Sequence, residues 1–346
     1  MSGAWKPASK AGVADQIVGN PLLSVENLST HFRTRRGLVK AVDGIDLQIR
    51  EGEILALLGE SGCGKSVTSL SLMGLIPPDG SGTVSGRVMF NGVDLCKLDH
   101  AQMRKLRGKD ISMIFQEPLS SLNPVMTVGR QIAEALICHG VAGKREARDK
   151  TVQLLREVGI SDPDSRFDTY PHELSGGMCQ RVMIAMAIAC DPKLLIADEP
   201  TTALDVTIQK QILNLIHALR ERRNTAVLLI THDLGVVAEH ADRVSVMYAG
   251  KVIEEAPVDV LFSAPAHPYT RGLLDSTPHL EHQGDHLPSI PGYVPDLVDL
   301  PAGCTFAPRC AYADERCREQ SPGRTVLSDV QSVRCWKPLT QVKVAA

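Results

Sequence analysis

Short apolar runs alternate with longer segments of mixed polarity between residues 21 and 257. Apolar runs of this length are typical of buried strands, and the segments between them show the spacing of helices. The strand candidates are LLSVENL (22–28), EILALL (53–58), DISMIF (110–115), LLIAD (194–198), AVLLIT (226–231) and RVSVMYAG (243–250). The helix candidates follow Lys65, cover about 129–139, 144–158, 177–190 and 204–223, and follow Asp233. This alternation predicts an α/β domain.

Turn residues mark the edges of the pattern. Pro77 and Pro78, with the Gly/Ser cluster after them, end the first helix. VSGRVMFNG at 84–92 predicts a hairpin edge with an Asn-Gly turn. Residues 1–20 are rich in Ala, Gly and Ser and predict a mobile tail. Prolines become frequent after Pro257, so the remainder of the chain predicts loops with few periodic segments.

The composition fits one large domain with an appendage. The chain has 346 residues, of which 43% are hydrophobic and 22% charged, enough for a sizeable core. Its net charge of −3 gives no support for a face that binds nucleic acid. The longest apolar stretches, at 182–190 and 226–230, are too short to span a bilayer, and the N-terminus has no apolar signal core. We therefore expect a cytoplasmic protein, in which stable disulfides are rare.

The segment GESGCGKS at 59–66 fits the pattern G-x-x-x-x-G-K-[ST] of a phosphate-binding loop. It follows a strand candidate and opens a helix, a context that disfavours a glycine-rich turn without a ligand. Backbone N–H groups would hold the phosphates, Lys65 would reach the β- and γ-phosphates, and the Ser66 hydroxyl would ligate Mg²⁺. Cys63 is interpreted as a small loop residue. The residues expected to line this nucleoside triphosphate site are Gly59, Ser61, Gly62, Cys63, Gly64, Lys65, Ser66 and Val67.

A second motif, LLIADEP at 194–200, supplies acidic groups for hydrolysis. Asp198, at the carboxyl end of an apolar strand candidate, is placed to hold Mg²⁺ through water. Glu199 beside it is placed to polarise an attacking water as a general base. A strand that ends in two solvated acids is common in isolation, but a phosphate-binding loop in the same chain requires an acid directed at the metal.

LSGGM at 174–178 resembles the signature sequence of ABC-type ATPases, and a helix candidate follows it. Ser175, Gly176 and Gly177 can present a hydroxyl and backbone N–H groups to a γ-phosphate. The resemblance implies that this phosphate is bound to the opposite subunit of a head-to-tail dimer. It also implies an ABC-type nucleotide-binding domain, with an antiparallel β subdomain and an α-helical subdomain at about 117–175.

Four further residues are similar to elements of the same family. Gln116, at the end of DISMIF, resembles the Q-loop glutamine, which contacts Mg²⁺ and water and senses the membrane partner. His232 resembles the switch histidine at the γ-phosphate, and Asp205 resembles the D-loop aspartate at the dimer interface. Phe32 lies where the family places an aromatic residue that stacks on adenine, although a Phe there fits a core position equally well.

Several longer segments resemble the ATP-binding subunits of bacterial dipeptide and oligopeptide importers. They are HFRTRRGLVKAVDGIDLQI, QEPLSSLNPVMTVG, YPHELSGGM, AHPYTRGLL (266–274) and the cysteine-containing C-terminus. The resemblance implies an ATPase domain at 21–260, between the tail at 1–20 and a C-terminal extension at 261–346. Close relatives carry nickel, glutathione or other small solutes, so these substrates stay open.

The same resemblance implies partners and a place in the cell. It implies a peripheral subunit at the cytoplasmic face of the bacterial inner membrane. The implied partners are two permease subunits, an extracytoplasmic substrate-binding protein and a second ATPase subunit, often a paralogue, that would make a heterodimer. ATP binding would close the ATPase dimer and hydrolysis would reopen it.

Two other functions fit parts of the sequence. Soluble ABC ATPases that act on DNA or ribosomes usually carry a second ATPase half, a coiled-coil insertion or a basic arm, and the sequence shows none of these. A regulatory subunit that binds ATP without turnover would not need Glu199 and His232, which are both intact. Met178 and Cys179 replace the Gln and Arg that many relatives have, and we expect them to affect partner contact modestly without loss of hydrolysis.

Four of the nine cysteines gather near the C-terminus with the spacing C-x5-C-x6-C-x17-C. Structural zinc sites usually use C-x2–4-C pairs, which this segment lacks. Wide spacing in a Pro-rich segment suits a four-thiolate iron–sulfur centre. The resemblance to peptide-importer ATPases that carry a C-terminal 4Fe–4S cluster indicates the same ligand, with Zn²⁺ and chance clustering as alternatives. The candidate ligands are Cys304, Cys310, Cys317 and Cys335.

Overall fold

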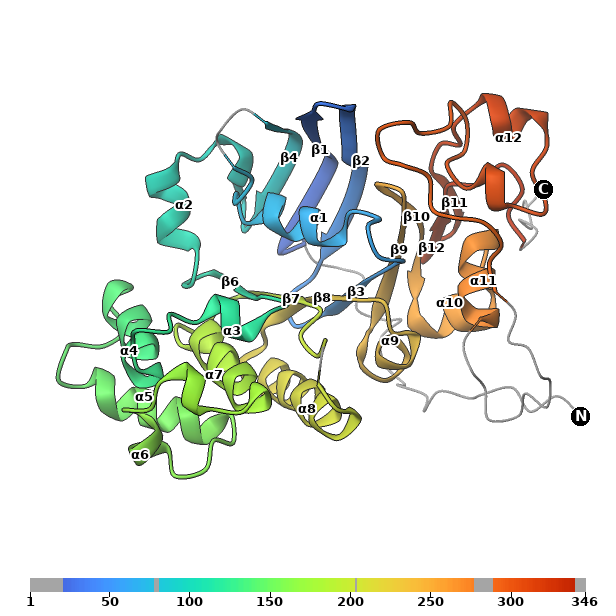
Figure 1. Ribbon diagram of the computed structural model, residues 1–346. Helices are drawn as coiled ribbons and strands as arrows, with labels where there is room; N and C mark the ends of the chain where they lie inside the picture. Colours follow the sequence, from blue (N-terminus) through green and yellow to red (C-terminus); the bar gives the residue numbers. More distant parts are fainter. Residues whose placement is uncertain (1–20, 78–80, 203, 277–288, 340–346) are drawn as a thin grey trace, which may run out of the picture. The chain divides into compact units, whose positions relative to one another are not determined.

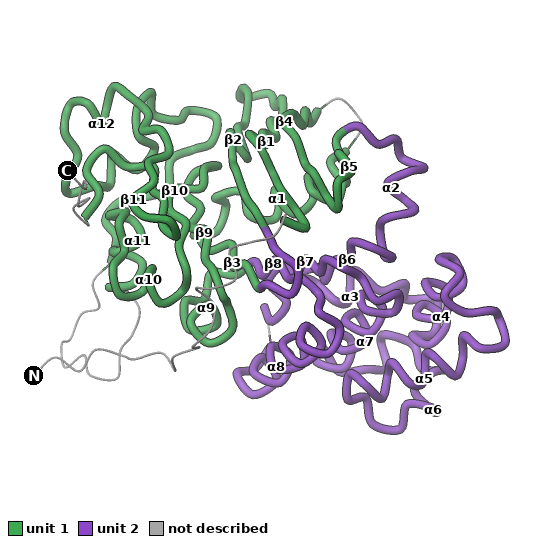
Figure 2. Tube along the Cα trace, turned by 180° about the vertical axis from the view of Figure 1, so that it is seen from behind, with its two compact units in different colours: residues 1–48, 54–96, 231–346 green, residues 49–53, 97–230 purple. Residues whose placement is uncertain are grey.

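The computed structural model describes residues 21–77, 81–202, 204–276 and 289–339. The chain divides into two compact units, shown in Figure 2. The first unit comprises residues 1–48, 54–96 and 231–346, and the second comprises 49–53 and 97–230. The predicted mobile tail at 1–20 lies outside the described residues. No helix in the described part of the chain is long and apolar enough to cross a membrane.

The first unit contains an antiparallel sheet in the order β2-β1-β4-β5. Its strands are β1 (Leu23–Thr34), β2 (Gly37–Ile49), β4 (Gly82–Phe90) and β5 (Val93–Asp94). The predicted hairpin edge is confirmed, since Phe90 pairs with Val93 across the Asn91-Gly92 turn. Both turn residues have positive φ, at 47° and 80°, which is the conformation that Asn-Gly hairpin turns require. The antiparallel β subdomain implied by the sequence is therefore present.

The first unit also contains five strands of a larger sheet, in the order β11-β12-β10-β9-β3. They are β3 (Ile54–Leu58), β9 (Arg243–Tyr248), β10 (Lys251–Pro257), β11 (Thr325–Ser328) and β12 (Gln331–Val333). All five residues of β3 are buried, as its unbroken apolar sequence predicts. Strand β3 runs parallel to β9, whereas β10 is antiparallel to both β9 and β12. Strands from the two ends of the chain therefore share one sheet.

The C-terminal extension is more regular than the sequence predicts. Besides β11 and β12 it holds the helices α11 (Pro268–Asp275) and α12 (Glu315–Glu319), labelled in Figure 1. It also holds a 3₁₀ turn, η3 (Ala307–Arg309). The α-helices described in the first unit are α1 (Lys65–Leu72), α9 (Leu234–His240), α10 (Val258–Ser263), α11 (Pro268–Asp275) and α12 (Glu315–Glu319). Its 3₁₀ turns are η1 (Leu95–Lys97) and η3 (Ala307–Arg309), and the last residue of η1 belongs to the second unit. Tyr269 and Phe306 of the extension pack in the same hydrophobic core as Leu58 and Val246. A shared core binds the extension to the strands that precede it.

Polar contacts join the extension to the same strands. Glu254 on β10 is 1% exposed, and its carboxylate accepts hydrogen bonds from the backbone N of Ala266 (2.7 Å) and His267 (2.8 Å) and from Gln331 Nε2 (3.0 Å). Burial raises the pKa of Glu254. A buried carboxylate is tolerated only when such donors satisfy it, so this residue anchors both AHPYTRGLL and β12.

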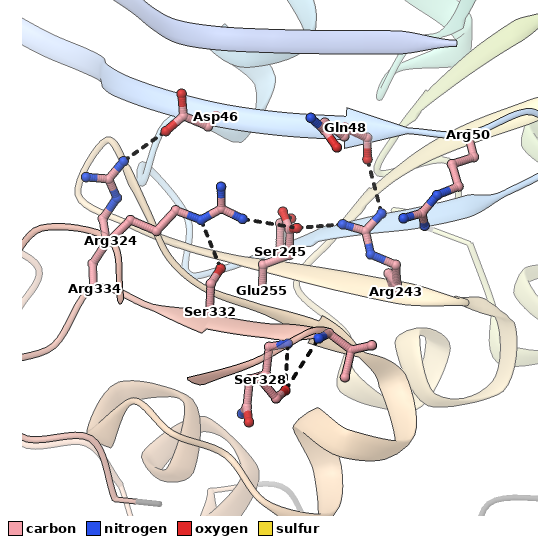
Figure 3. Close-up of polar contacts among 12 residues, drawn as sticks. Asp46, Gln48, Arg50, Arg243, Ser245, Glu255, Arg324, Ser328, Ser332 and Arg334 are labelled. Carbon is pink, nitrogen blue, oxygen red and sulfur yellow. Dashed lines mark hydrogen bonds and ion pairs between the residues drawn. The ribbon is translucent and has the colours of Figure 1, made fainter. Parts of the chain in front are cut away.

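A second polar cluster, drawn in Figure 3, lies along β2, β9, β10 and β12. Arg334 Nη2 contacts Asp46 Oδ2 at 3.1 Å. Glu255 accepts hydrogen bonds from Arg243 Nη2 (2.5 Å) and Ser245 Oγ (2.9 Å). The Arg334–Asp46 pair connects the extension to β2, 288 residues away in the sequence, whereas the Glu255 contacts join the neighbouring strands β9 and β10.

The second unit combines a parallel sheet segment with helices. Strands β6 (Ile111–Ile114), β7 (Leu194–Asp198) and β8 (Ala226–Thr231) pair in parallel, with β7 in the centre. The helices are α2 (His100–Leu106), α3 (Pro118–Ser121), α4 (Val128–Cys138), α5 (Ala147–Glu157), α6 (Pro163–Arg166), α7 (Gly176–Ile188) and α8 (Val206–Arg223), with one 3₁₀ turn, η2 (Pro171–Glu173). Helices α4, α5 and α7 pack on one another. The implied α-helical subdomain is present in this unit.

Candidate active site

The predicted phosphate-binding loop lies between β3 and α1 in the first unit. Its shape depends on two glycines: Gly62 has φ 79°, and Gly64 has φ 108°. A Cβ atom on Gly64 would lie 2.1 Å from the carbonyl oxygen of Ala41, so no other residue fits there without displacing β2. Helix α1 begins directly after Gly64, at Lys65. A glycine-rich loop that leads directly into a helix start is the arrangement whose backbone N–H groups bind phosphates.

Lys65 is 5% exposed and folds back over the loop. Its Nζ donates hydrogen bonds to the carbonyl oxygens of Gly59 (2.8 Å) and Glu60 (3.1 Å). Ser66 and Val67 are half-buried at the start of α1, Ser61 is exposed, and the Cys63 thiol is buried, which raises its pKa. The buried thiol agrees with the interpretation of Cys63 as a small loop residue.

Two further predicted residues lie in the first unit. His232 is exposed between β8 and α9, where Asp233 caps the helix by accepting hydrogen bonds from the N of Gly235 (2.7 Å) and Val236 (3.2 Å). Phe32 is half-buried on β1, and its ring would lie 3.1 Å from a Cβ placed on Gly82. Phe32 is therefore only partly accessible, and its role in stacking on adenine stays a prediction.

The second unit brings together the residues predicted for hydrolysis. Glu199 directly follows β7 and has φ 45°, a left-handed conformation that is uncommon for a residue with a side chain. Its Oε2 accepts hydrogen bonds from Gln116 Nε2 (3.1 Å) and Thr202 Oγ1 (3.0 Å). Strands β6 and β7 are neighbours, which places Gln116 and Glu199 at the same edge of the sheet. The structure thus joins two predicted catalytic residues that are far apart in the sequence.

Asp198 is the last residue of β7 and is 4% exposed. A carboxylate buried to this extent is costly unless a cation or hydrogen-bond donors balance it. The carboxyl end of a parallel strand beside Glu199 is where a metal-directed acid belongs. An acid at this end of a buried strand therefore suits the predicted role of Asp198 in holding Mg²⁺. The roles of Ser66 and Gln116 as further ligands stay predictions.

The signature residues begin helix α7. Ser175 is its N-cap and accepts a hydrogen bond from Met178 N at 3.3 Å. Ser175 and Gly176 are exposed and Gly177 is half-exposed, so this helix start is accessible to a ligand. Cys179 is buried, and its Sγ donates to the carbonyl oxygen of Pro171 at 3.3 Å.

Asp205 forms the N-cap of helix α8. Its Oδ1 accepts hydrogen bonds from the N of Thr207 and Ile208, both at 3.0 Å. The residue is exposed, which leaves its second carboxylate oxygen accessible to a partner. A capping role and a role at a dimer interface are therefore compatible, and the interface role stays a prediction.

The four C-terminal cysteines line one pocket in the first unit. All four carry free thiols. Burial raises the pKa of Cys304 and Cys310, and that of Cys335 to about 11, and each rise is increased by repulsion from the other thiolates of the group. The described residues contain no group of three or more His, Cys, Asp or Glu side chains arranged as a metal-ion site. The four cysteines thus share a pocket, but within the described residues they are not grouped as a metal-ion site.

Sequence reasoning missed several residues that position the site. Gln180 is 1% exposed on α7, and its Nε2 donates to the carbonyl oxygen of Pro200 at 2.6 Å, directly after Glu199. Thr202 contacts Glu199 itself. Glu60 in the phosphate-binding loop pairs with Arg309 of the extension. Of these residues, only Gln180 could have been suspected from the sequence, because it lies two residues beyond the signature. Its burial and its partner are seen only in the structure.

Comparison with known proteins shows the class of this protein. The ABC transporter family matches residues 42–202, and the family described as "Oligopeptide/dipeptide transporter, C-terminal region" matches residues 253–317. The dimeric ATP-binding cassette MJ0796, in a post-hydrolysis state bound to ADP and Pi, has a similar structure. The TM-score is 0.61 at 28% identity, covering 68% of this chain and 98% of that one. The fold is that of an ABC-type ATPase.

Relatives of nearly the same length show to which group of ABC-type ATPases the chain belongs. A probable peptide ABC transporter ATP-binding protein of Sinorhizobium fredii is 53% identical, covering 91% of this chain and 95% of the relative. The dipeptide transport ATP-binding protein DppD of Bacillus subtilis is 52% identical (91% and 94%), and DppD of Escherichia coli is 50% identical (92% and 97%). The chain therefore belongs to the family of ATP-binding subunits of peptide ABC transporters.

Proposed function

We propose that this chain hydrolyses ATP to power the import of dipeptides or oligopeptides through a membrane ABC transporter. The hydrogen bond between Gln116 and Glu199 carries the hydrolytic part, because it places a glutamine and a general base together at the carboxyl end of β7. The match of the C-terminal extension and the names of the full-length relatives support peptides as the cargo. No feature of the described residues favours nickel or glutathione.

Each residue has a role in the proposed reaction. The loop N–H groups and Lys65 bind the phosphates. Asp198, with Ser66 and Gln116, would hold Mg²⁺, which would supply positive charge to neutralise the phosphate oxygens. Glu199 accepts a proton from the water whose oxygen forms the new bond to the γ-phosphorus. The bond from that phosphorus to the bridging oxygen breaks, and ADP leaves with the electron pair.

Further residues complete this mechanism in the proposed dimer. His232 contacts the γ-phosphate, and Phe32 stacks on adenine. Ser175, Gly176 and Gly177 of each subunit bind the γ-phosphate held by the other, and Asp205 lies at the interface between them. The exposure of Ser175 and Asp205 supports these roles. Because the closed dimer binds ATP more tightly than the open one, ATP binding closes the pair and hydrolysis reopens it.

The proposed partners are a paralogous ATPase subunit, two permease subunits and an extracytoplasmic binding protein, at the cytoplasmic face of the inner membrane. Leu119 and Val125, which follow Gln116, are 56% and 79% exposed, and such apolar side chains suit contact with a permease. The ATPase domain of this proposal covers 21–260 and the extension covers 261–346.

We also propose that Cys304, Cys310, Cys317 and Cys335 hold a 4Fe–4S cluster. Their shared pocket and mutual repulsion as thiolates fit a group that binds four thiolates at once. The cluster would cross-link the four cysteines and so stabilise the extension. A change in its oxidation state would alter the charge in the pocket. Anaerobic purification tests this: absorbance near 400 nm with about four iron atoms per chain supports it, whereas colourless protein with stoichiometric zinc would contradict it.

Transport tests the main proposal. The chain, its paralogue and the permeases are reconstituted in liposomes with the binding protein, and ATP-dependent uptake of labelled dipeptides, nickel and glutathione is compared. We expect ATP-dependent uptake of the labelled dipeptides, and we expect Glu199→Gln to abolish it. Uptake of nickel or glutathione without peptide uptake would overturn the cargo, and unchanged hydrolysis in Glu199→Gln would overturn the assignment of the base.

A further inference from the structure

One residue of the phosphate-binding loop is held at both its side chain and its backbone by the C-terminal extension. The Glu60 carboxylate accepts two hydrogen bonds from Arg309, Nη1 to Oε2 at 2.8 Å and Nη2 to Oε1 at 3.2 Å. The Glu60 backbone N donates to the hydroxyl of Tyr269 at 3.1 Å. Both partners come from segments that follow the ATPase motifs in sequence. The extension is thus in direct contact with the ATP site.

Arg309 is itself rigidly placed. Its side chain is 6% exposed, and its Nε donates to the carbonyl oxygen of Pro291 at 2.9 Å. Further contacts go to the Tyr248 hydroxyl and the Ile290 carbonyl oxygen, both at 3.4 Å. A two-bond guanidinium–carboxylate pair fixes orientation as well as distance. Movement of Arg309 would therefore either move Glu60 or leave a nearly buried charge without its partner, which is costly.

Glu60 in turn is connected to the groups that bind phosphate. Its carbonyl oxygen accepts hydrogen bonds from Lys65 Nζ at 3.1 Å and from the N of Cys63 at 3.3 Å. The same residue therefore has its N, its carbonyl and its carboxylate all engaged. A shift of Glu60 would change the curvature of the loop and the position of Lys65, and with them the affinity for nucleotide.

Arg309 is also the chain neighbour of Cys310, which lines the cysteine pocket. It ends the 3₁₀ turn η3, in which Ala307 N donates to the Cys304 carbonyl oxygen (3.0 Å) and Cys310 N donates to the Ala307 carbonyl oxygen (3.3 Å). Ala307 and Phe306 line the pocket together with the four cysteines. Phe306 further packs edge-on against Tyr248 and Tyr269, at centroid distances of 5.3 and 5.4 Å. Phe306 thus lines the cysteine pocket and also packs on Tyr269, whose hydroxyl accepts the hydrogen bond from Glu60 N.

From these contacts we propose that Arg309 and Tyr269 are positioning residues for the phosphate-binding loop, and that through Arg309 the state of the four-cysteine pocket sets nucleotide affinity. This inference rests on the proposed binding of ATP by the same loop. It assigns the extension a regulatory task in the ATPase cycle, whatever group the thiols hold. A change at the thiols would move η3, and the Arg309–Glu60 pair would transmit this displacement to the loop.

A double-mutant cycle tests the first step. The dissociation constant of a fluorescent ATP analogue is measured for the full chain, for Glu60→Gln, for Arg309→Gln and for the double variant. Each single variant should weaken binding about 5- to 30-fold, the range typical of coupling between sites. The double variant should be no weaker than the single ones, because the same pair is lost. Arg309→Lys should recover part of the affinity. Single effects that multiply in the double variant would overturn the proposal.

Arg334→Gln is the matched control, since Arg334 also joins the extension to an acidic residue of the body, Asp46, at 3.1 Å. It should leave the dissociation constant unchanged; an increase equal to that of Arg309→Gln would indicate general loosening and refute specific positioning. Tyr269→Phe, which removes only the hydroxyl, should weaken nucleotide binding in the same direction. If the wild-type chain binds no nucleotide, the proposed function is wrong. If the wild-type chain binds nucleotide and Arg309→Gln leaves the dissociation constant unchanged, only the positioning role is wrong.

The second step is tested with Cys310→Ser in the wild-type and Arg309→Gln backgrounds. Cys310→Ser should change the dissociation constant at least about threefold in the wild-type background and leave it unchanged in the other. Equal changes in both backgrounds, or none in either, would overturn the coupling. Cys335→Ser, outside η3, serves as a second variant if Cys310→Ser does not fold. Iron and zinc are quantified in the same samples, so failure of the proposed cluster is recognised independently of the nucleotide data.

Discussion

Replacing Glu254 by Gln probes how firmly the extension is fastened to the sheet. The carboxylate accepts three hydrogen bonds, from the N of Ala266, the N of His267 and Gln331 Nε2, while the residue is 1% exposed. A Gln side chain keeps one acceptor oxygen and turns an NH₂ group towards at least one of these donors. A buried donor left without a partner costs about 1–3 kcal/mol. With one or two donors affected, we expect the free energy of unfolding to fall by about 2–4 kcal/mol.

Urea denaturation, followed by the fluorescence of Trp336, measures this loss. Trp336 reports on the extension because its Nε1 donates to the Gln320 carbonyl oxygen at 2.9 Å and its ring packs against Arg316. Glu26→Gln is the control: Glu26 is exposed on β1 and its ion pair with Arg87 is long, at 3.9 Å, so the change should be below about 0.5 kcal/mol. If Glu254→Gln unfolds at the same urea concentration as the wild type, the buried acceptor does not fasten the extension.

Three further outcomes follow from the structure. Glu199→Gln should lower kcat for ATP hydrolysis by about 10²- to 10⁴-fold while nucleotide binding persists, and phosphate release in the assembled transporter measures it. Gln180→Leu should lower kcat but not nucleotide affinity, because it removes the hydrogen bond to the Pro200 carbonyl oxygen; a changed dissociation constant with unchanged kcat would contradict this. Burial raises the Glu254 pKa above 4.5, so the folded state binds this proton more tightly than the unfolded state. The wild type should therefore gain stability over Glu254→Gln as the pH falls towards 4.5, and urea midpoints across that range check the sign.

The sequence predicted the strands and helices that have a clear pattern of apolar and polar residues of their own. Strands such as β6 and β7 were found within one residue of their ends, because continuous apolar runs bounded by polar residues define a buried strand. Strand β2 was missed because its buried and exposed positions do not alternate regularly. Strands β11 and β12 are only four and three residues long. Strand β12 pairs with β10 and β11 pairs with β12, and this pairing rather than their own composition stabilises them.

The candidate site divides in the same way. Motifs that bind phosphate or activate water are local, because the chemistry needs particular residue types at fixed spacing, and these were found from the sequence. The contacts that position them are not local: Glu60 and Arg309 lie 249 residues apart, and Gln116 and Glu199 lie 83 apart. Each of these contacts provides a hydrogen-bond partner for a polar side chain of a motif, such as the Glu60 carboxylate in the phosphate-binding loop. A motif therefore identifies what the chemistry is, whereas the packing of distant segments decides how tightly the reacting groups are held, and here it gives the extension influence over the ATP site.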